Sequence, residues 1–381
     1  MKKFLTFSLT VFIIVAGLFA LSKTDYFGDL PQALVRTVKA HIQAASDSVT
    51  MEDPSATYDE AVLGSEYHYY YEKLSDSDKL LYRQIYVMLD DLKDGIVLNT
   101  DDVDNVSRIQ QFVLLDNPQF FYVEKSQYTQ TTKIVFSPVL NMSKSEIESA
   151  RSAISGYVSA CMAGLSQDAS DYDKAVHFYE YIIEHTDYDE NSTHNQDMYS
   201  VVLGHTVCQG YAMMFKYMCD QAGIPSMIVT GATSDANHAW NMVCIDGVWS
   251  TVDCTYGDGD YLGKGISYSW FGVPSDVIKL TRTIDNEDMV PQESSVQNDY
   301  YYRNGLYFTS YALGTLQDMT LSSNYITFKF ADQQSYDTAC RKLFEQGDYK
   351  YLIPTARGGT VTYMQEPNSL AVFIYIQLGG N

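Results

Sequence analysis

Apolar residues recur at helical spacing over two stretches in the first third of the chain. One stretch runs from Ser75, which can cap a helix, to Gly95, which can end it. The other covers 103–114 and stops before Pro118. A strand-like pattern follows over 120–136. Together these elements predict an N-terminal α/β unit over residues 58–140.

Two more helices and a group of strands are predicted downstream. Capped helical patterns cover 143–165 and 172–186. Near the C-terminus, aromatic and polar residues alternate as they do in strands, and one helical pattern interrupts them. The predicted strands are 300–311, 325–330 and 370–378, and the predicted helix is 335–346. This pattern predicts a small α+β unit over 286–381.

The first 22 residues have the pattern of an export signal. Lys2 and Lys3 precede an uncharged, largely apolar run over 4–21, and Ala20, Leu21 and Ser22 offer a small-x-small cleavage site at its end. The run is also long enough to cross a bilayer, so both a cleaved signal peptide and an N-terminal anchor remain open. Residues 23–57 are polar and lack periodicity, which indicates a linker. The sequence therefore predicts an exported protein, either secreted or tethered to the outer face of the membrane.

Composition agrees with a folded protein of more than one unit. The chain has 381 residues, of which 46% are hydrophobic and 19% are charged, and this length exceeds the usual size of one core. Its formal charge of −23 argues against nucleic acid as a partner, because binding to phosphates needs clustered Lys and Arg. Oligomeric state is not predictable from these features.

Six cysteines would allow three disulfides in an exported protein. However, Cys219 and Cys244 lie inside apolar patterns that are typical of buried thiols. A nucleophilic Cys208 would also have to stay free. The other five cysteines could then not all form disulfides. We therefore expect one disulfide at most. We expect no metal or other cofactor, because the Cys and His residues show no short paired spacing.

Cys208 stands at the predicted start of a helix. Gly204 to Val207 lead into it, and apolar residues then keep helical spacing until Gly223 and Pro225. The dipole and free N–H groups of a helix N-terminus stabilise a thiolate, and they can also hold an oxyanion. Taken alone, a cysteine in an apolar helix is more typical of a core thiol.

A predicted hairpin brings a histidine close to a carboxylate. Asp246 and Gly247 separate two strand-like runs, a strong signal for a two-residue turn. In this register Ile245 faces Val248 and Trp240 faces Asp253. His238 then lies diagonally across from Asp253, within reach of its carboxylate. A base held in one tautomer by a carboxylate is the partner that a nucleophilic thiol needs.

The three sequence blocks that carry these residues resemble those of the transglutaminase-like cysteine enzyme superfamily, including its exported bacterial members. They are Cys-Gln-Gly-Tyr-Ala at 208–212, His-Ala-Trp-Asn at 238–241 and Val-Asp-Cys-Thr-Tyr-Gly-Asp at 252–258. The resemblance covers roughly 172–260. It implies an α+β fold with a papain-like core, in which the nucleophile's helix packs on an antiparallel sheet. It also implies Cys208 as nucleophile, His238 as base and Asp253 as the residue that orients the base. The corresponding catalytic domain would span 141–285.

Two further residues are weaker candidates for the site. Gln196 precedes the nucleophile in a polar loop, where its side-chain amide could complete an oxyanion hole or merely cap a helix. Trp240 could line the acyl channel or fill the core.

The predicted reaction is formation of a Cys208 thioester from a peptide or glutamine amide. Hydrolysis by a peptidase or deamidase is favoured, because water is the abundant acceptor outside the cell. Cross-linking by a protein-glutamine gamma-glutamyltransferase is an alternative, and a catalytically idle surface-binding protein is another. The expected partner is a protein or peptide substrate, with cell-wall peptide as one candidate.

Overall fold

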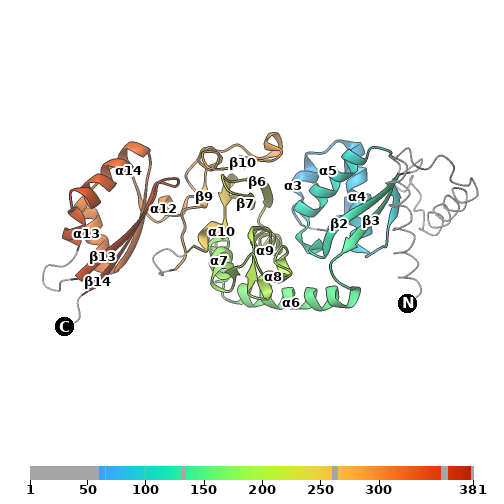
Figure 1. Ribbon diagram of the computed structural model, residues 1–381, viewed down its shortest axis with the longest axis horizontal. Coiled ribbons are helices and arrows are strands. Elements are labelled where there is room, and N and C mark those ends of the chain that lie inside the picture. The colour runs from blue at the N-terminus through green and yellow to red at the C-terminus, as the bar shows by residue number, and fades with distance from the viewer. Residues whose placement is uncertain are drawn as a thin grey trace, which may run out of the picture.

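The computed structural model arranges the chain as three parts in a row along its longest axis (Figure 1). It describes residues 60–378 except 65, 99, 131–133, 260–264 and 353–358. The apolar run at 4–21 and the predicted linker lie outside these residues. Within the described ranges, no helix combines the length and apolar character needed to cross a membrane.

The N-terminal part packs short helices on a three-stranded antiparallel sheet with strand order β1-β3-β2. Its elements are η1 (Glu60–Val62), α3 (Tyr69–Glu72), α4 (Asp76–Asp90), β1 (Ile96–Leu98), α5 (Val103–Asp116), η2 (Pro118–Phe120), β2 (Val123–Gln130) and β3 (Ile134–Leu140). The predicted helices are confirmed, and Ser75 caps α4 by accepting a hydrogen bond from the Asp78 N–H. The single strand-like region predicted over 120–136 is wrong, because a 3₁₀ turn beginning at Pro118 comes first and two paired strands follow.

The central part contains a five-stranded antiparallel sheet with strand order β10-β6-β7-β8-β9. Its helices are α6 (Lys144–Ala163), α7 (Asp171–Glu184), α8 (Met198–Val202), α9 (Cys208–Gln221), α10 (Cys254–Gly257), α11 (Ser275–Ile278) and η3 (Glu287–Met289). Its strands are β4 (Asp187–Tyr188), β5 (His205–Thr206), β6 (Ser226–Ala232), β7 (Asn237–Ile245), β8 (Val248–Val252), β9 (Phe271–Val273) and β10 (Thr283–Ile284). Helix α9 packs against β6 and β7, so the predicted α+β class with a helix on an antiparallel sheet is confirmed.

The C-terminal part has a four-stranded sheet with strand order β11-β12-β14-β13. Its elements are α12 (Tyr300–Arg303), β11 (Tyr307–Phe308), α13 (Leu313–Ser322), β12 (Tyr325–Phe330), α14 (Gln333–Cys340), the π-helical η4 (Arg341–Glu345), η5 (Asp348–Leu352), β13 (Gly359–Glu366) and β14 (Ala371–Leu378). Most of the strand predicted over 300–311 is wrong. Asp299 accepts hydrogen bonds from the N–H groups of Tyr301 and Tyr302, which starts a helical turn instead. Helix α13 and strand β13 were not predicted from the sequence.

The N-terminal and central parts share one continuous apolar core, whereas the C-terminal part has a second core of its own. Two polar contacts, one of them fully buried, reinforce the first junction. The Tyr70 hydroxyl donates to the Ile228 carbonyl at 2.8 Å, and the Lys216 ammonium donates to the Tyr67 carbonyl at 3.0 Å. Lys216 is itself paired with Asp220, both side chains being almost fully buried. The N-terminal part is therefore held firmly beside the nucleophile's helix.

A close approach at Gly210 fixes the start of α9. A Cβ atom there would lie 2.7 Å from the Asp197 carbonyl oxygen and even nearer to Thr206 Oγ1. We expect Gly210→Ala to lower the free energy of unfolding by about 1–3 kcal/mol, because the added methyl group overpacks this contact. Urea unfolding measures the effect. The matched control is Gly156→Ala in α6, where a Cβ meets nothing within 4 Å. The free energy of unfolding of the control should rise by about 0.5–1 kcal/mol. Equal changes in the two variants would contradict the close approach at Gly210.

Candidate active site

Cys208 is the first residue of α9, as the sequence predicts. The preceding residue, Val207, has an extended backbone and supplies no side-chain cap. The first amides of α9 are therefore available to an anion placed beside the Cys208 sulfur. The thiol itself is half-buried and lines a pocket.

The β7–β8 hairpin brings His238 and Asp253 together. The predicted register is confirmed, because Ile245 pairs with Val248 and Asn241 pairs with Val252. His238 Nε2 lies 2.8 Å from Asp253 Oδ2, which leaves Nδ1 as the nitrogen free to serve the thiol. The Cys208 side chain is a hydrogen-bond partner of the same ring. The structure thus brings all three predicted triad residues together.

Asp253 is held by more than the histidine. Its Oδ1 accepts the Tyr256 N–H and so caps α10, while its Oδ2 also accepts Arg282 Nη2 at 2.7 Å. Both side chains of this ion pair are almost fully buried, at 1% and 0% exposure. The Asp253 carboxylate is therefore fixed in orientation and balanced in charge.

Arg282 is a site residue that the sequence analysis missed. Its guanidinium lies 4.3 Å from the ring centroid of Trp270 and 4.6 Å from that of Tyr256. Trp270 in turn donates from its indole nitrogen to Glu366 of the C-terminal part. Arg282 follows Asp253 by 29 positions and stands outside the three blocks, so no local pattern in the sequence marks it.

The charges of this cluster shift two pKa values in opposite directions. Burial acts to raise the pKa of Asp253, but the positive charges of His238 and Arg282 outweigh it and hold the pKa at about 2. Burial acts to lower the pKa of His238, but Asp253 and the Cys208 sulfur outweigh it and raise the pKa to about 9. At neutral pH the cluster therefore favours an imidazolium next to the Cys208 sulfur.

We expect the imidazole resonance of His238 to titrate near pH 9, well above the value of about 6.5 for an ordinary histidine. The ring should be protonated below that pH and neutral above it, because the Asp253 charge favours the cation. NMR titration of the wild type and of Asp253→Asn measures the shift. Neutralising Asp253 should move the titration to lower pH, and an unchanged midpoint in that variant would contradict this explanation.

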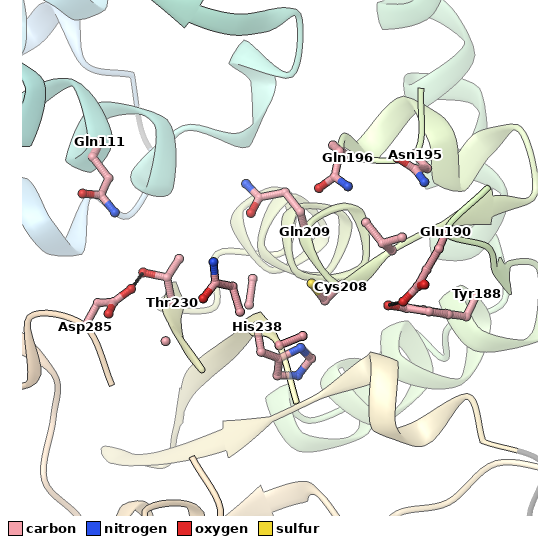
Figure 2. A pocket seen from close by; sticks show the side chains of 15 residues that line it. Gln111, Tyr188, Glu190, Asn195, Gln196, Cys208, Gln209, Thr230, His238 and Asp285 are labelled. Carbon is pink, nitrogen blue, oxygen red and sulfur yellow. Dashed lines mark hydrogen bonds between the residues drawn. The ribbon is translucent and has the colours of Figure 1, made fainter. Parts of the chain in front are cut away.

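The triad opens into a pocket of about 630 Å³. Figure 2 shows Cys208 and His238 between Glu190 and Tyr188 on one side and Thr230, Asp285 and Gln111 on the other. Gln111 comes from α5, so the N-terminal part contributes to the wall. Side-chain amides, hydroxyls and two carboxylates lie around the thiol, beside apolar surface from Val207, Ala236 and Ala239.

The two weaker candidates occupy different positions. Gln196 is exposed, lines the pocket and projects its amide into it (Figure 2), which fits a role as an oxyanion donor. Trp240 is only 1% exposed and stacks behind His238 with 5.7 Å between the ring centroids. Trp240 lies deeper along β7 and is not among the residues that line this pocket, so of its two predicted roles it fills the core and does not line an acyl channel.

All six cysteines are free thiols in the structure. Across the described ranges, no group of three or more His, Cys, Asp or Glu residues is placed to hold a metal ion.

Comparison with known families assigns the segment that carries the triad. Residues 159–254 match the model of the transglutaminase-like superfamily. The chain contains a transglutaminase-like domain. All three triad residues fall inside the matched segment, whereas Arg282 and Gln111 lie outside it.

Individual relatives of the transglutaminase-like domain are distant. Kyphoscoliosis peptidase from Mus musculus is 29% identical over 117 residues, covering 26% of this chain and 18% of that protein. The Homo sapiens protein of the same name matches to the same extent. The chain thus spans about a fifth of the length of these curated relatives.

Solved structures are more distant still. A crystal structure of a TGase aligns at 17% identity and a TM-score of 0.26, covering 42% of this chain and 50% of the other. A candidate cysteine protease from Cytophaga hutchinsonii aligns at 14% identity and a TM-score of 0.25, covering 34% and 61%. The family assignment therefore rests on the sequence match.

Proposed function

We propose that this protein is an exported thiol enzyme that cleaves peptide or glutamine amide bonds through a Cys208 thioester. The observation that carries the proposal is the His238–Asp253–Arg282 cluster, which places a charged imidazole beside a cysteine at a helix N-terminus. The name of the curated relatives, a peptidase, agrees with this choice.

The proposed reaction begins when the Cys208 thiolate attacks the amide carbonyl carbon. The first amides of α9 and the Gln196 side chain hold the oxyanion that forms. His238 gives its proton to the departing amine as the carbon–nitrogen bond breaks, which leaves a thioester. His238 then takes a proton from water, whose oxygen attacks the thioester. A carboxylic acid product leaves, and the thiolate is restored.

Hydrolysis is the favoured outcome because the amide, hydroxyl and carboxylate groups around the thiol can bind water and because export would place the site in a dilute aqueous medium. The apolar run at 4–21 supports export, with the protein either secreted or tethered by that segment. The substrate would be a protein or peptide, including cell-wall peptide.

Amine transfer is a second candidate because carboxylates lie on both sides of the thiol. Glu190 and Asp285 line the pocket on opposite sides of Cys208 (Figure 2), and either could hold a lysine ammonium group. An amine that attacked the thioester would make the protein a protein-glutamine gamma-glutamyltransferase. The complete triad disfavours a catalytically idle binding protein, since such a protein would have no need of it.

One experiment separates these reactions. Wild type and Cys208→Ala are incubated with a mixed peptide pool and a primary amine, and the products are identified by mass spectrometry. We expect new peptide termini or deamidated glutamine with the wild type alone. Amine incorporation as the main product would select cross-linking instead. Identical products from both proteins would reject the thiol mechanism.

A further inference from the structure

A second hollow adjoins the active-site pocket on the side away from Glu190. It has a volume of about 470 Å³ and shares Gln111, Gln209 and Thr230 with the first pocket. Because three residues line both, the two hollows are neighbouring parts of one groove that passes Cys208. Figure 2 shows Gln209 extending from α9 toward the side of the groove where Gln111 projects from α5.

The outer wall of the second hollow belongs to the N-terminal part. Ser107, Gln110, Gln111 and Leu114 line it from α5, and their spacing places them on one face of that helix. Strand β2 adds further polar groups beside them. The Gln110 side-chain oxygen accepts the Tyr128 hydroxyl at 2.7 Å, which ties the helix to the strand. This wall lies outside the segment that matches the family.

The groups that line this hollow suit an extended peptide backbone. Gln111 and Gln209 each offer an amide donor and acceptor that can pair with peptide groups. Ser126 Oγ is buried and has no hydrogen-bond partner among the described residues, although a buried hydroxyl is normally bonded. Bound main chain could satisfy it.

The hollow also carries one positive charge. Lys125 is the single Lys or Arg among the described residues that line it. Its side chain is 62% exposed and lies 3.5 Å from that of Glu124, which is 55% exposed. An ion pair this exposed contributes little to stability. Lys125 is therefore free to attract an acidic side chain, in contrast to the two carboxylates that flank the thiol.

We propose that this groove binds an extended polypeptide segment of the substrate, with α5 as its outer wall and Lys125 selecting acidic residues at its far end. The inference rests on the proposed function, in which Cys208 attacks an amide of such a chain. It makes the N-terminal part a component of the substrate site.

The test measures how fast Cys208 is alkylated by two probes. One is iodoacetamide, and the other is a pool of randomised, cysteine-free octapeptides that each carry an iodoacetyl group. In both reactions the thiolate displaces iodide and forms a thioether. We expect the wild type to react about tenfold faster with the peptide pool than with iodoacetamide, which corresponds to about 1.4 kcal/mol of binding.

Filling the groove should remove this preference. Gln111→Trp should bring the peptide rate down to the iodoacetamide rate of the same variant, so that the ratio of the two rates falls to about one. The matched control is Gln127→Trp, since Gln127 is an exposed glutamine on β2 that does not line the hollow. The control should retain the wild-type preference, and retention of that preference by Gln111→Trp would overturn the proposal.

Charge reversal tests the assigned specificity. Sequencing the attached peptides should show Asp and Glu enriched with the wild type and Lys and Arg enriched with Lys125→Glu. Lys144→Glu is the matched control, because the Lys144 side chain is also 62% exposed but lies on α6. An unchanged peptide profile in Lys125→Glu would overturn the role of this lysine.

These measurements distinguish a failure of the groove proposal from a failure of the proposed function. An iodoacetamide rate no faster than that of a free thiol would reject the activated nucleophile. The ratio of the peptide rate to the iodoacetamide rate, compared between wild type and Gln111→Trp, would still decide whether the groove binds peptide.

Discussion

Replacing Cys208 with alanine should abolish turnover, with a loss of about 10⁶-fold in kcat that leaves only background hydrolysis. The variant removes the sulfur that would form the thioester, and no other cysteine thiol lines the pocket among the described residues. Its fold should be nearly unaffected, because Cys208 is only half-buried and alanine is the best helix former. Kinetics on the peptides identified by mass spectrometry, together with a thermal melt, measure both effects.

A matched control for this variant is Cys244→Ala. Cys244 is also a half-buried thiol, but it lies at the far end of β7 and outside the pocket. It should keep wild-type turnover. If Cys208→Ala were strongly destabilised while Cys244→Ala lost activity, Cys208 would be a core thiol and the nucleophile would lie elsewhere.

Neutralising Asp253 should reduce both activity and stability. We expect Asp253→Asn to lower kcat/KM by about 10⁴-fold, because the imidazole loses the charge that fixes its tautomer and favours its protonation. The free energy of unfolding should fall by about 3–5 kcal/mol, because the buried Arg282 guanidinium is left without an opposite charge. Steady-state kinetics and urea unfolding measure the two losses separately.

Asp299 offers a closely matched control for the second variant. It is also a buried aspartate that caps a short helix and pairs with a buried cation, with its Oδ2 accepting Lys329 Nζ at 2.7 Å. Asp299→Asn should therefore lose comparable stability but retain activity under conditions where it is folded. Equal activity losses in the two variants would show that Asp253 matters only for folding.

The triad was predictable because local rules fix most of its geometry. A two-residue turn sets the hairpin register, and that register alone brings His238 close to Asp253. Helix signals in the same way place Cys208 at an N-terminus. Residues whose place depends on short edge elements or on packing between parts were not predictable. Arg282 reaches Asp253 just before the two-residue strand β10, and Gln111 reaches the pocket from a different part of the fold.

The same distinction explains the errors. The alternation of side chains along β7 correctly places Trp240 on the same face as His238. It does not show which positions on that face line the pocket. Near the C-terminus, aromatic residues with strand-like alternation begin a helical turn, because the Asp299 side chain caps it. Side-chain capping at a single position can outweigh a periodic pattern of this length.

The division of the apolar core sets the cooperative units of this protein. The N-terminal part and the transglutaminase-like domain bury one core between them, and the C-terminal sheet buries another. A fragment limited to 159–254 would expose the faces of α9 and β6 that Tyr70 and its neighbours cover. The segment that carries the catalytic residues is therefore not expected to fold on its own. Its stability depends on the N-terminal part, whereas the C-terminal part keeps a core of its own.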